Sequence, residues 1–563
     1  MGHTRQGNAP HRLAHIMSDP EADVLIIGGG INGLATFREL TLQGVKTVLV
    51  EKSDYCSGAS AASSHMIHGG IRYLENGEIR LVRESLLERN RLLANAPHFV
   101  KPLKTTIPIF STFSGLLAAP LKLFFQTKTG PKERGALLIK IGLMLYDTFG
   151  RFGGRLPRHE FFGRKKSLGA LPNLNKGVKY TAHYYDAAIE SPERLAMDIL
   201  RDSLSLGTHA RAANYLEAVA MADDSVTLRD TITGETFSFR APVVLNASGP
   251  WADKTNSGLG LPSSYMGGTK GSHIVLKNDR LFEACDGREI FFENKDGRIV
   301  LMYPLLDRVL VGTTDIPIDD PDDARCTEEE VDYFFDLASH VFPDITLDRS
   351  QIVFRYSGVR PLPAAGDINP GVISRDYRIV KEKLSENTWL WSLIGGKWTT
   401  FRALGEHWAN EVLAHLGRER TISTVDLPIG GGAGFPTTPH SRDAWVEAHR
   451  GALSAERATE LLNRYGTFAQ TIIEDLDTLG DEPLTHAPQY SRGEIISLVQ
   501  REQVVTLSDL THRRTSLAFV GDLSGPCLEE IGNIISEIKG WDTSHVKKEL
   551  GSITLERSQS NGA

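Results

Sequence analysis

The hydrophobic pattern near the start of the chain alternates between short apolar runs and one stretch with helical spacing. Residues 24–27 (VLII) and 47–50 (TVLV) are apolar runs of the length typical of buried strands. Between them, a stretch that ends at Leu42 carries apolar side chains at the spacing of a helix. This succession predicts a strand, a helix and a second strand, the unit from which parallel sheets are built.

Glycines occupy the turn between the predicted first strand and the helix. Gly28, Gly30 and Gly33 have the spacing G-x-G-x-x-G, and Glu51 directly follows the second strand. Such glycines permit a tight turn, close approach of a pyrophosphate to the backbone, and close packing of helix on strand. An acidic side chain about 20 residues further on accepts a hydrogen bond from a ribose hydroxyl. The unit predicts a dinucleotide site, and the motif leaves NAD and FAD open.

Further along, one break in the pattern separates a C-terminal region. The Gly/Pro-rich stretch 428–440 predicts a linker, and residues 441–550 show helical periodicity with polar faces. Residues 1–20 lack the apolar run of a signal peptide, and Met17 is a second candidate start. No apolar stretch of the sequence reaches the roughly 18 to 20 residues that span a bilayer, so a cytoplasmic protein is expected.

Composition narrows the class of protein. At 563 residues the chain exceeds one ordinary core, so two or three domains are expected. The net charge of −8 argues against a dedicated nucleic-acid binder, which would need a basic face. The four cysteines lie far apart without a C-x-x-C pair, which argues against a disulfide scaffold and a zinc site. Neither a metal nor a nucleic acid is expected.

Residues 57–75 (SGASAASSHMIHGGIRYLE) combine small residues, two histidines, a Gly-Gly pair and an Arg-Tyr pair. Together with the glycine motif, this stretch resembles the flavin-dependent glycerol-3-phosphate dehydrogenases, a family of D-amino-acid-oxidase-type flavoproteins. One position differs, because family members usually carry Lys where this chain has His65. Further segments resemble the same family in the family's order: 137–150, 184–207, 243–253, 270–275, 303–315, 356–362, 374–377 and 393–406.

The resemblance implies an α/β fold with three parts. These are a Rossmann-type FAD-binding domain of the D-amino-acid-oxidase type, a substrate-cap domain built on an antiparallel sheet, and a C-terminal helical domain. The first two are expected from separated pieces of the chain. The expected boundaries are a flexible lead-in at 1–20, FAD-binding pieces at 21–95, 184–260 and 352–415, cap and membrane-facing pieces at 96–183 and 261–351, a linker at 428–440, the helical domain at 441–550 and a tail at 551–563.

A non-covalent FAD is the cofactor that the resemblance implies. In the family, the element after the second strand lays small residues and backbone amides along FAD, and the run HGG-x-RYLE borders the flavin ring and the substrate. The segment 393–406 is expected to form a strand, a Gly-Gly turn and a helix capped by Thr399 and Thr400, whose N-terminus faces the electron-rich edge of the reduced flavin. The expected cofactor-binding residues are Gly28, Gly30, Asn32, Gly33, Glu51, Lys52, Ser57, Ser60, Ser63, Ser64, His68, Gly69, Gly70, Ala247, Gly249, Gly395, Gly396, Lys397, Thr399 and Thr400.

The substrate that the resemblance implies, sn-glycerol 3-phosphate, carries a phosphate group that needs several fixed cations. Arginine suits this task because its planar fork pairs two phosphate oxygens at once. Taken alone, each such residue is far more often a surface residue or a salt-bridge partner, and its place in a family motif singles it out. The expected substrate-binding residues are Arg72, Tyr73, Arg360, Arg375 and Lys397.

The implied reaction forms dihydroxyacetone phosphate by hydride transfer from C2 of the substrate to flavin N5. His273 is a candidate for the base that takes the C2 hydroxyl proton, since histidine accepts a proton near neutral pH. Lys397 is the other candidate if burial beside other cations lowers its pKa, and Arg360 completes the expected catalytic set. A histidine that only forms a hydrogen bond within the cap domain stays the alternative for His273.

Residues 120–170 hold eleven Lys and Arg against three Asp and Glu, a local excess of eight positive charges in a chain that is net negative. The short apolar pieces 113–125 and 136–145 lie in or beside this stretch. Basic residues interleaved with Leu and Phe suit a surface on anionic lipid, and a solvated basic face over a buried helix is the alternative. With the resemblance, this predicts a peripheral enzyme on the inner face of the cell membrane that passes electrons to a quinone. A homodimer stays open.

Three other functions are compatible with parts of this pattern. A glycerol-3-phosphate oxidase uses the same site and passes electrons to oxygen, whereas the basic and apolar stretch favours a quinone. An amine or amino-acid oxidase would need one carboxylate-binding arginine and an apolar pocket, but this chain has three arginines and a lysine in site motifs. A catalytically inactive flavin-binding regulator would not need Arg360, Arg375, His273 and Lys397 together.

Overall fold

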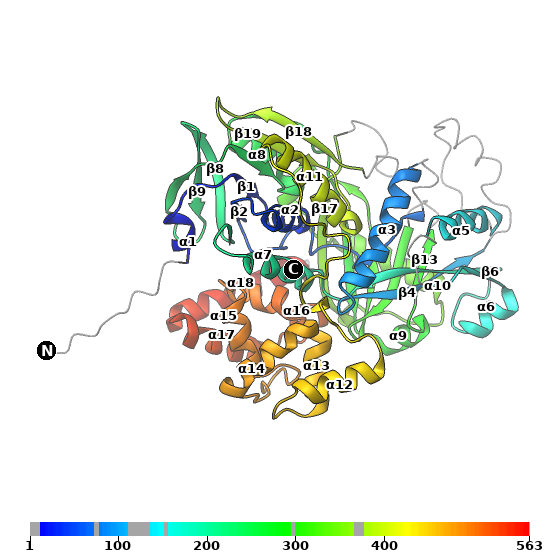
Figure 1. The fold of residues 1–563 in the computed structure, drawn as a ribbon. Helices are drawn as coiled ribbons and strands as arrows, with labels where there is room; N and C mark the ends of the chain where they lie inside the picture. Colours follow the sequence, from blue (N-terminus) through cyan, green and yellow to red (C-terminus); the bar gives the residue numbers. More distant parts are fainter. Residues whose placement is uncertain are drawn as a thin grey trace.

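The computed structural model describes residues 12–71, 78–110, 136–150, 156–293, 299–364 and 376–561. Figure 1 shows three parts: a parallel sheet with flanking helices, a large mostly antiparallel sheet, and a helical domain formed by the C-terminal end of the chain. The fold class predicted from the sequence is therefore confirmed.

The first part is a six-stranded sheet in the order β18-β19-β11-β1-β2-β7, with its edge pair β18–β19 antiparallel. Every residue of β1 and β2 is buried, which is why both strands read as continuous apolar runs, and their predicted bounds are confirmed. The strands are β1 (Val24–Ile27), β2 (Thr47–Val50), β7 (Ala210–Ala213), β11 (Val243–Asn246), β18 (Arg378–Lys383) and β19 (Trp389–Ile394).

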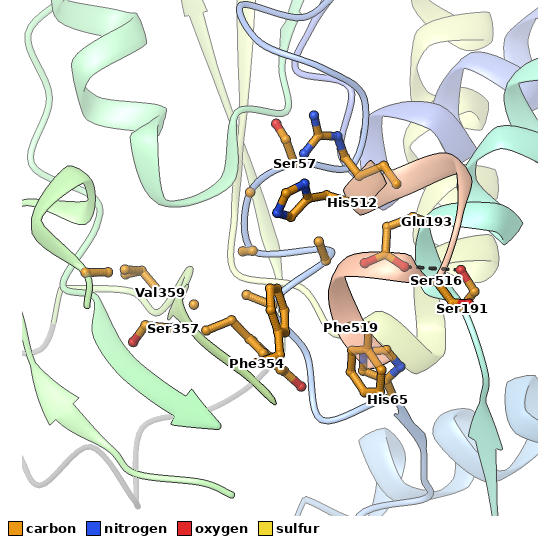
Figure 2. A pocket seen from close by; sticks show the side chains of 18 of the residues that line it. Ser57, His65, Ser191, Glu193, Phe354, Ser357, Val359, His512, Ser516 and Phe519 are labelled. Atoms are coloured by element: carbon orange, nitrogen blue, oxygen red, sulfur yellow. Dashed lines mark hydrogen bonds between the residues drawn. The ribbon is translucent and has the colours of Figure 1, made fainter. Parts of the chain in front are cut away.

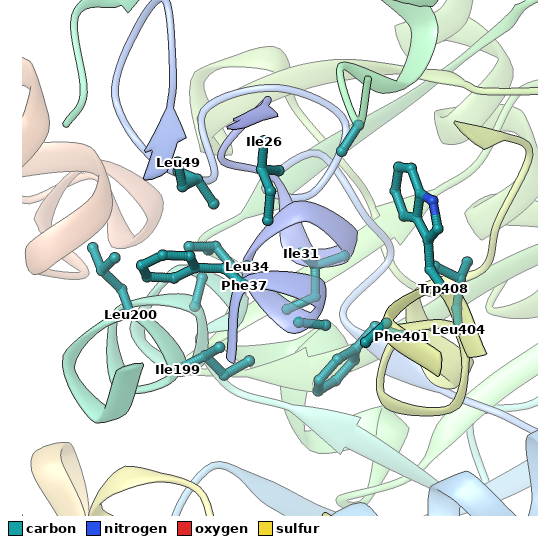
Figure 3. Close-up of a cluster of buried hydrophobic side chains, with 14 of the residues drawn as sticks. Ile26, Ile31, Leu34, Phe37, Leu49, Ile199, Leu200, Phe401, Leu404 and Trp408 are labelled. Carbon is teal, nitrogen blue, oxygen red and sulfur yellow. The ribbon is translucent and has the colours of Figure 1, made fainter. Parts of the chain in front are cut away.

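Helix α2 (Ile31–Leu42) begins directly after the glycine turn and packs against α7 (Pro192–Leu204) and α11 (Phe401–His415). The approach of α11 is close, because a Cβ on Gly405 would lie 3.0 Å from the Cβ of Ala35. Helix α2 is therefore held between two neighbours as well as on the sheet. The buried cluster around it includes Ile26, Ile31, Leu34, Phe37, Leu49, Ile199, Leu200, Phe401, Leu404 and Trp408 (Figure 3).

A smaller antiparallel sheet covers the other side of the parallel sheet. Its residues Val226, Leu228 and Phe239 share a buried cluster with Leu25 and Val48 of β1 and β2. The short helices α1 (Ala14–Met17) and α8 (Ala252–Gly258) accompany this side. The strands are β8 (Leu216–Ala222), β9 (Ser225–Asp230) and β10 (Thr236–Phe239).

The second part is a ten-stranded sheet in the order β16-β12-β15-β14-β13-β4-β6-β3, with β17 beside β12 and β5 beside β6. The pair β4–β13 is parallel. Ile352–Arg360 pairs along its length with β12 and so lies in this sheet, although the sequence analysis assigns 352–415 to the FAD-binding domain. The strands are β3 (Met66–Ile67), β4 (Val100–Ile109), β5 (Glu160–Gly163), β6 (Tyr180–Ile189), β12 (Thr269–Leu276), β13 (Glu289–Glu293), β14 (Ile299–Leu305), β15 (Arg308–Gly312), β16 (Ile316–Pro317) and β17 (Ile352–Arg360).

Helices pack on the ten-stranded sheet. Helices α9 (Asp279–Cys285) and α10 (Glu328–Val341) share a buried core with β12, β14 and β15. Helix α5 (Ala136–Gly150) packs on α3 (Ile79–Asn95) and β6. Helix α6 (Arg164–Ala170) follows β5. Among the residues that the structure describes, no helix combines the length and apolar character needed to cross a membrane.

The third part is a helical domain with its own buried core, as predicted for 441–550. Its core includes Leu461, Ile472, Leu498 and Ile531. A π-helical turn, Asp509–Arg514, faces the rest of the molecule. The helices are α12 (Pro439–His449), α13 (Ala455–Tyr465), α14 (Ala469–Leu479), α15 (Arg492–Arg501), α16 (Leu517–Val520), α17 (Gly525–Lys539) and α18 (Thr543–Asn561).

Candidate functional site

The glycine turn leaves no room for side chains. Gly28 has a φ of +112°, and a Cβ there would lie 2.6 Å from the carbonyl oxygen of Ala247. A Cβ on Gly33 would lie 2.0 Å from the carbonyl oxygen of Gly28. Gly30 occupies the N-cap position of α2 with extended backbone. The turn, the start of α2 and the end of β11 therefore meet backbone to backbone, as a pyrophosphate-binding turn requires.

Side-chain oxygens accept hydrogen bonds from backbone N–H groups in and around this turn. The side chain of Glu51 accepts hydrogen bonds from the N–H of Gly29 at 2.7 Å and of Ser53 at 2.9 Å. Burial raises the pKa of Glu51. At the start of α2, the N–H of Ile31 donates to Ser60 Oγ at 3.0 Å. The carboxylate is thus fixed at the end of β2, where a ribose would lie.

The Gly-Gly turn after β19 reaches the same place from the far end of the chain. Gly396 has a φ of +111°, and a Cβ there would lie 2.9 Å from Asn32 Nδ2. Gly395 has a φ of +87°, and its Cβ would lie 2.7 Å from the carbonyl oxygen of Asp376. Asn32 Oδ1 is buried and has no hydrogen-bond partner within the described residues. A buried acceptor beside backbone that excludes side chains fits a bound polar cofactor such as FAD.

The two glycine turns and the start of α2 form what we call the FAD cradle. Residues 57–70 form a wall between this cradle and the ten-stranded sheet. On the cradle side, Trp398 Nε1 donates to the carbonyl oxygen of Ser60 at 3.0 Å. On the sheet side, the Tyr356 hydroxyl donates to the carbonyl oxygen of Ser63 at 2.8 Å, and the Tyr303 hydroxyl to that of Ser64 at 3.0 Å. The wall is therefore anchored by aromatic donors on both sides.

His273 lies on the face of β12 that meets this wall. Its Nε2 is 2.8 Å from Ser64 Oγ, and its ring stacks on Tyr356 with centroids 4.8 Å apart. The side chain is 2 % exposed, and burial together with the charge of Arg360 lowers the pKa of His273 well below its usual value. A Cβ on Gly312, its cross-strand neighbour, would lie 2.1 Å from the ring. His273 is therefore a neutral imidazole in a fixed orientation.

Arg360 ends β17 and turns onto the same face. A Cβ on Gly271 would lie 2.3 Å from its NH2, so the guanidinium lies directly over Gly271. NH1 lies 3.1 Å from Asp315 Oδ1, and NH2 donates to Thr313 Oγ1 at 3.1 Å and to the carbonyl oxygen of Thr314 at 2.9 Å. The side chain stays 25 % exposed. Gly271 and His273 are two residues apart on β12, so they lie on the same face of the sheet. The structure thus brings Arg360 and His273 together on that face.

Lys397 follows the Gly-Gly turn and reaches back to the wall. Its Nζ donates to the carbonyl oxygen of His68 at 2.6 Å and to Ser85 Oγ at 3.1 Å. Burial is the main cause that lowers the pKa of Lys397 to about 7. The predicted capping role of the next threonines is wrong: Thr399 Oγ1 donates to the carbonyl oxygen of His68 and Thr400 Oγ1 to that of Lys397, both at 3.3 Å. Thr400 is the N-cap residue of α11 but its side chain accepts no hydrogen bond from the helix, and Thr399 Oγ1 accepts from the N–H of His68 at 3.3 Å instead.

Other predicted residues lie at the margins. Lys52 is exposed, with Nζ 5.0 Å from the ring centre of Trp251. Gly249 begins a 3₁₀ turn with a φ of +59°, and Gly70 has a φ of +75° beside His68 and Gly69. Arg72, Tyr73 and Arg375 lie outside the described residues.

A cavity of about 360 Å³ lies where the wall, β17 and the C-terminal domain meet (Figure 2). Ser57, predicted to bind the cofactor, lines it. His65 lines it too, with its ring 5.2 Å from that of Phe519, and burial lowers the pKa of His65 to about 4. Glu193 lines the same cavity, and burial raises its pKa to about 7. The position that departs from the family pattern is thus a neutral residue at the interface with the C-terminal domain.

Sequence reasoning missed the residues behind Gly69. Tyr146 and Asp186 both accept a hydrogen bond from the Gly69 N–H, at 2.9 Å and 3.1 Å. Asp186 lies in the stretch YYDAAIE, where a charged residue interrupts an apolar strand, and that interruption was the available signal.

Comparison with known proteins agrees with this geometry. Residues 23–410 match the model of a family described as FAD dependent oxidoreductase, and residues 422–546 match one described as the C-terminal domain of alpha-glycerophosphate oxidase. A glycerol-3-phosphate dehydrogenase of Synechocystis sp. is 32 % identical, over 94 % of this chain and 95 % of that protein. The aerobic glycerol-3-phosphate dehydrogenase of Escherichia coli is 30 % identical, over 88 % of this chain and 93 % of that protein.

Two further relatives bear on the fold and the substrate. The D-erythritol 1-phosphate dehydrogenase of Brucella abortus is 30 % identical, over 89 % of this chain and 95 % of that protein. The structure of a glycerol-3-phosphate dehydrogenase from Bacillus halodurans, solved with FAD, has a TM-score of 0.73 at 23 % identity and covers 97 % of this chain and 96 % of that one. That likeness shows a shared fold over nearly the whole chain.

Proposed function

Because the chain belongs to the family of FAD-dependent oxidoreductases, we propose that it oxidises sn-glycerol 3-phosphate to dihydroxyacetone phosphate. FAD, when bound, supplies the acceptor for the hydride from C2. The observation that carries the proposal is the position of Arg360 on the shared face of β12 and β17. Its guanidinium lies over Gly271, which is two residues before His273, and this face meets the wall of the FAD cradle. A cation suited to a phosphate thus lies beside the cofactor site.

Arg360 has the role of binding the phosphate. Its guanidinium is held in one plane by Asp315 and Thr314, so its fork is oriented before a ligand arrives. Pre-organised donors lose less freedom on binding, which favours affinity. We propose that Arg72, Tyr73 and Arg375 supply the remaining donors.

Of the two candidate bases, we favour Lys397. A general base works best when its pKa lies near the working pH, and the pKa of Lys397 is about 7. His273 has a pKa well below its usual value and is a weaker proton acceptor. Its contact with Ser64 Oγ at 2.8 Å suits it to hold the wall and the substrate hydroxyl in place.

The test is anaerobic addition of glycerol 3-phosphate to the purified yellow protein. The proposal expects the flavin absorbance to bleach, and an unchanged spectrum would contradict it and favour a flavin-binding regulator. Arg360→Lys keeps the charge and loses the fork, so the KM should rise by about tenfold or more. Arg349→Lys, an exposed arginine of the same part of the molecule paired with Glu328 and Asp332, is the matched control.

A second substrate deserves the same assay. The relative named D-erythritol 1-phosphate dehydrogenase is as similar to this chain as the Escherichia coli enzyme is. Both substrates share a phosphate and a secondary alcohol, so Arg360 and Lys397 would serve either. Comparison of kcat/KM for glycerol 3-phosphate and D-erythritol 1-phosphate decides between them, and a higher value for the second would replace the proposed substrate.

We further propose that the outer face of α5 rests on an anionic lipid surface and that electrons pass to a quinone there. Leu137, Ile141, Met144 and Leu145 are 42–55 % exposed and follow one side of the helix. Exposed basic residues accompany them: Lys140, Arg158, Arg164, Lys165 and Lys166. Buried apolar area combined with attraction to anionic headgroups is the usual basis of such binding. Of the predicted basic residues, Lys122, Lys128, Lys132, Arg134, Arg151 and Arg155 lie outside the described residues, as does the piece 113–125.

Sedimentation with anionic vesicles tests this surface. The double variant Ile141→Glu and Met144→Glu should stay in the supernatant, while Ile232→Glu, similarly exposed at 51 % in the turn between β9 and β10, should still sediment. Turnover with a quinone analogue, compared with oxygen, tests the acceptor. Hydrogen peroxide formed in equal amount to the product would identify an oxidase instead.

A further inference from the structure

The peptide group between His68 and Gly69 is held at both of its polar atoms. Its carbonyl oxygen accepts from Lys397 Nζ at 2.6 Å. Its N–H, on Gly69, donates to the Tyr146 hydroxyl at 2.9 Å and to Asp186 Oδ1 at 3.1 Å. Because a peptide unit is planar, contacts at both ends leave it one orientation.

Asp186 is the centre of a buried polar cluster behind this peptide. The same Oδ1 also accepts from the Tyr146 hydroxyl at 2.6 Å and from Arg89 NH1 at 2.9 Å. Asp186 is 2 % exposed, and Arg89 and Tyr146 are each 3 % exposed. Burial and the charge of Asp186 raise the pKa of Tyr146 well above its usual value, so its hydroxyl stays a neutral donor.

The cluster is assembled from three elements that are separate in the sequence. Arg89 belongs to α3, Tyr146 to α5 and Asp186 to β6. A Cβ on Gly69 would lie 2.5 Å from the Tyr146 hydroxyl, so the close approach depends on glycine at that position. A buried ion pair costs desolvation energy and adds little to stability compared with apolar side chains. A buried ion pair at this position therefore points to a role in the site and not to a role in stability.

We propose that Asp186, Arg89 and Tyr146 form a positioning cluster that fixes the His68–Gly69 peptide and, across that peptide, holds the side chain of Lys397 beside a negative charge. The cluster touches neither substrate nor the reacting atoms. It acts through Lys397, and it rests on the proposed function only where turnover is the readout.

Within the described part of the chain, Lys397 faces charged groups on α3, just before α3 and on β6. Burial lowers its pKa to about 7, and Asp186 on β6 opposes this shift. Arg89 on α3 lowers the pKa further, while Glu84 on α3 and Glu78 just before it raise it. Loss of the Asp186 charge should therefore move the pKa of Lys397 downward, whichever protonation state of Lys397 is active.

Asp186→Asn in the full-length enzyme removes the charge and keeps the shape. Competitive acetylation of Lys397 across pH, read by mass spectrometry, should show its titration lowered by about one pH unit or more. The matching limb of the pH profile of kcat/KM should move in the same direction. The acetylation readout needs no turnover. A chain without activity on either polyol phosphate would therefore defeat the proposed function and leave this comparison readable.

Tyr146→Phe separates position from charge. This variant keeps the charge of Asp186, so the pKa of Lys397 should not change. The rate constant kcat/KM should fall about tenfold, because the Gly69 N–H loses its hydrogen bond to the Tyr146 hydroxyl. The control is Tyr180→Phe, which also removes a tyrosine hydroxyl. Tyr180 lies on β6 and its ring contacts Phe161, away from the cluster, so this variant should keep the wild-type rate. An unmoved titration in Asp186→Asn overturns the proposal. Should that variant fail to accumulate, a wild-type kcat/KM in Tyr146→Phe overturns it equally.

Discussion

Asp54, just after β2, forms a buried ion-pair contact between the FAD-binding part and the C-terminal domain, and its neutralisation should loosen that domain. It follows Glu51 by three positions and is 1 % exposed. Asp54 Oδ2 and Oδ1 accept from Arg514 NH1 and NH2 at 2.7 Å and 2.9 Å, and Arg513 Nε reaches Oδ2 at 2.5 Å. Arg514 is fully buried. Asp54→Asn removes the carboxylate that both guanidinium groups share, which leaves Arg513 with Asp509 at 2.9 Å and Arg514 with Glu502 only at 3.7 Å.

The size of the effect follows from this burial. Removal of one partner from a buried ion pair costs about 3–5 kcal/mol, because the remaining charge is left uncompensated. Burial raises the pKa of Asp54, but the charges of Arg514 and Arg513 outweigh it and hold the pKa well below its usual range. Because the pKa of Asp54 is lower in the folded than in the unfolded state, its carboxylate contributes its full stabilisation above about pH 4. This contribution is lost as the pH falls through the folded pKa. The difference between wild type and variant should therefore be largest at neutral pH and shrink in acid.

Urea unfolding at several pH values measures this difference. The matched control is Asp475→Asn, whose partner Arg501 at 2.6 Å is 44 % exposed and lies within the helical domain. Exposed pairs contribute about 1 kcal/mol or less, so the control should unfold nearly as the wild type does. Equal losses in the two variants, or a loss in Asp54→Asn that persists unchanged in acid, would refute the reasoning.

Two glycine substitutions test the close approaches in the site. Gly271→Ala places a Cβ 2.3 Å from Arg360 NH2, so the guanidinium must move; the KM should rise about ten- to a hundredfold with little change in melting temperature. Gly163→Ala, with open space around it, is the control. Gly33→Ala places a Cβ 2.0 Å from the carbonyl oxygen of Gly28, so the ratio of flavin to protein absorbance should fall sharply, and full occupancy would contradict the cradle.

The parts of the fold that could be predicted are those whose cause is local in the sequence. The strand bounds 24–27 and 47–50 and the helix end at Leu42 came out unchanged because β1 and β2 are buried on both faces and α2 packs on two sides, which leaves strong periodic patterns. β17 shows the opposite case. Its place beside β12 depends on pairing with a strand about 80 residues away, and no local pattern states which sheet a strand joins.

The same distinction separates the predicted site residues from the missed ones. A capping rule applied to Thr399 and Thr400 failed, because their hydroxyls bond to residues outside α11, Thr399 to His68 and Thr400 to Lys397, and a local rule counts only the helix. Asp186 was missed because its partners come from α3, α5 and the wall, and only the folded chain joins them. A charged residue inside an apolar strand is costly wherever it occurs, so in this chain such an interruption is itself a signal that a buried partner and a site must exist nearby.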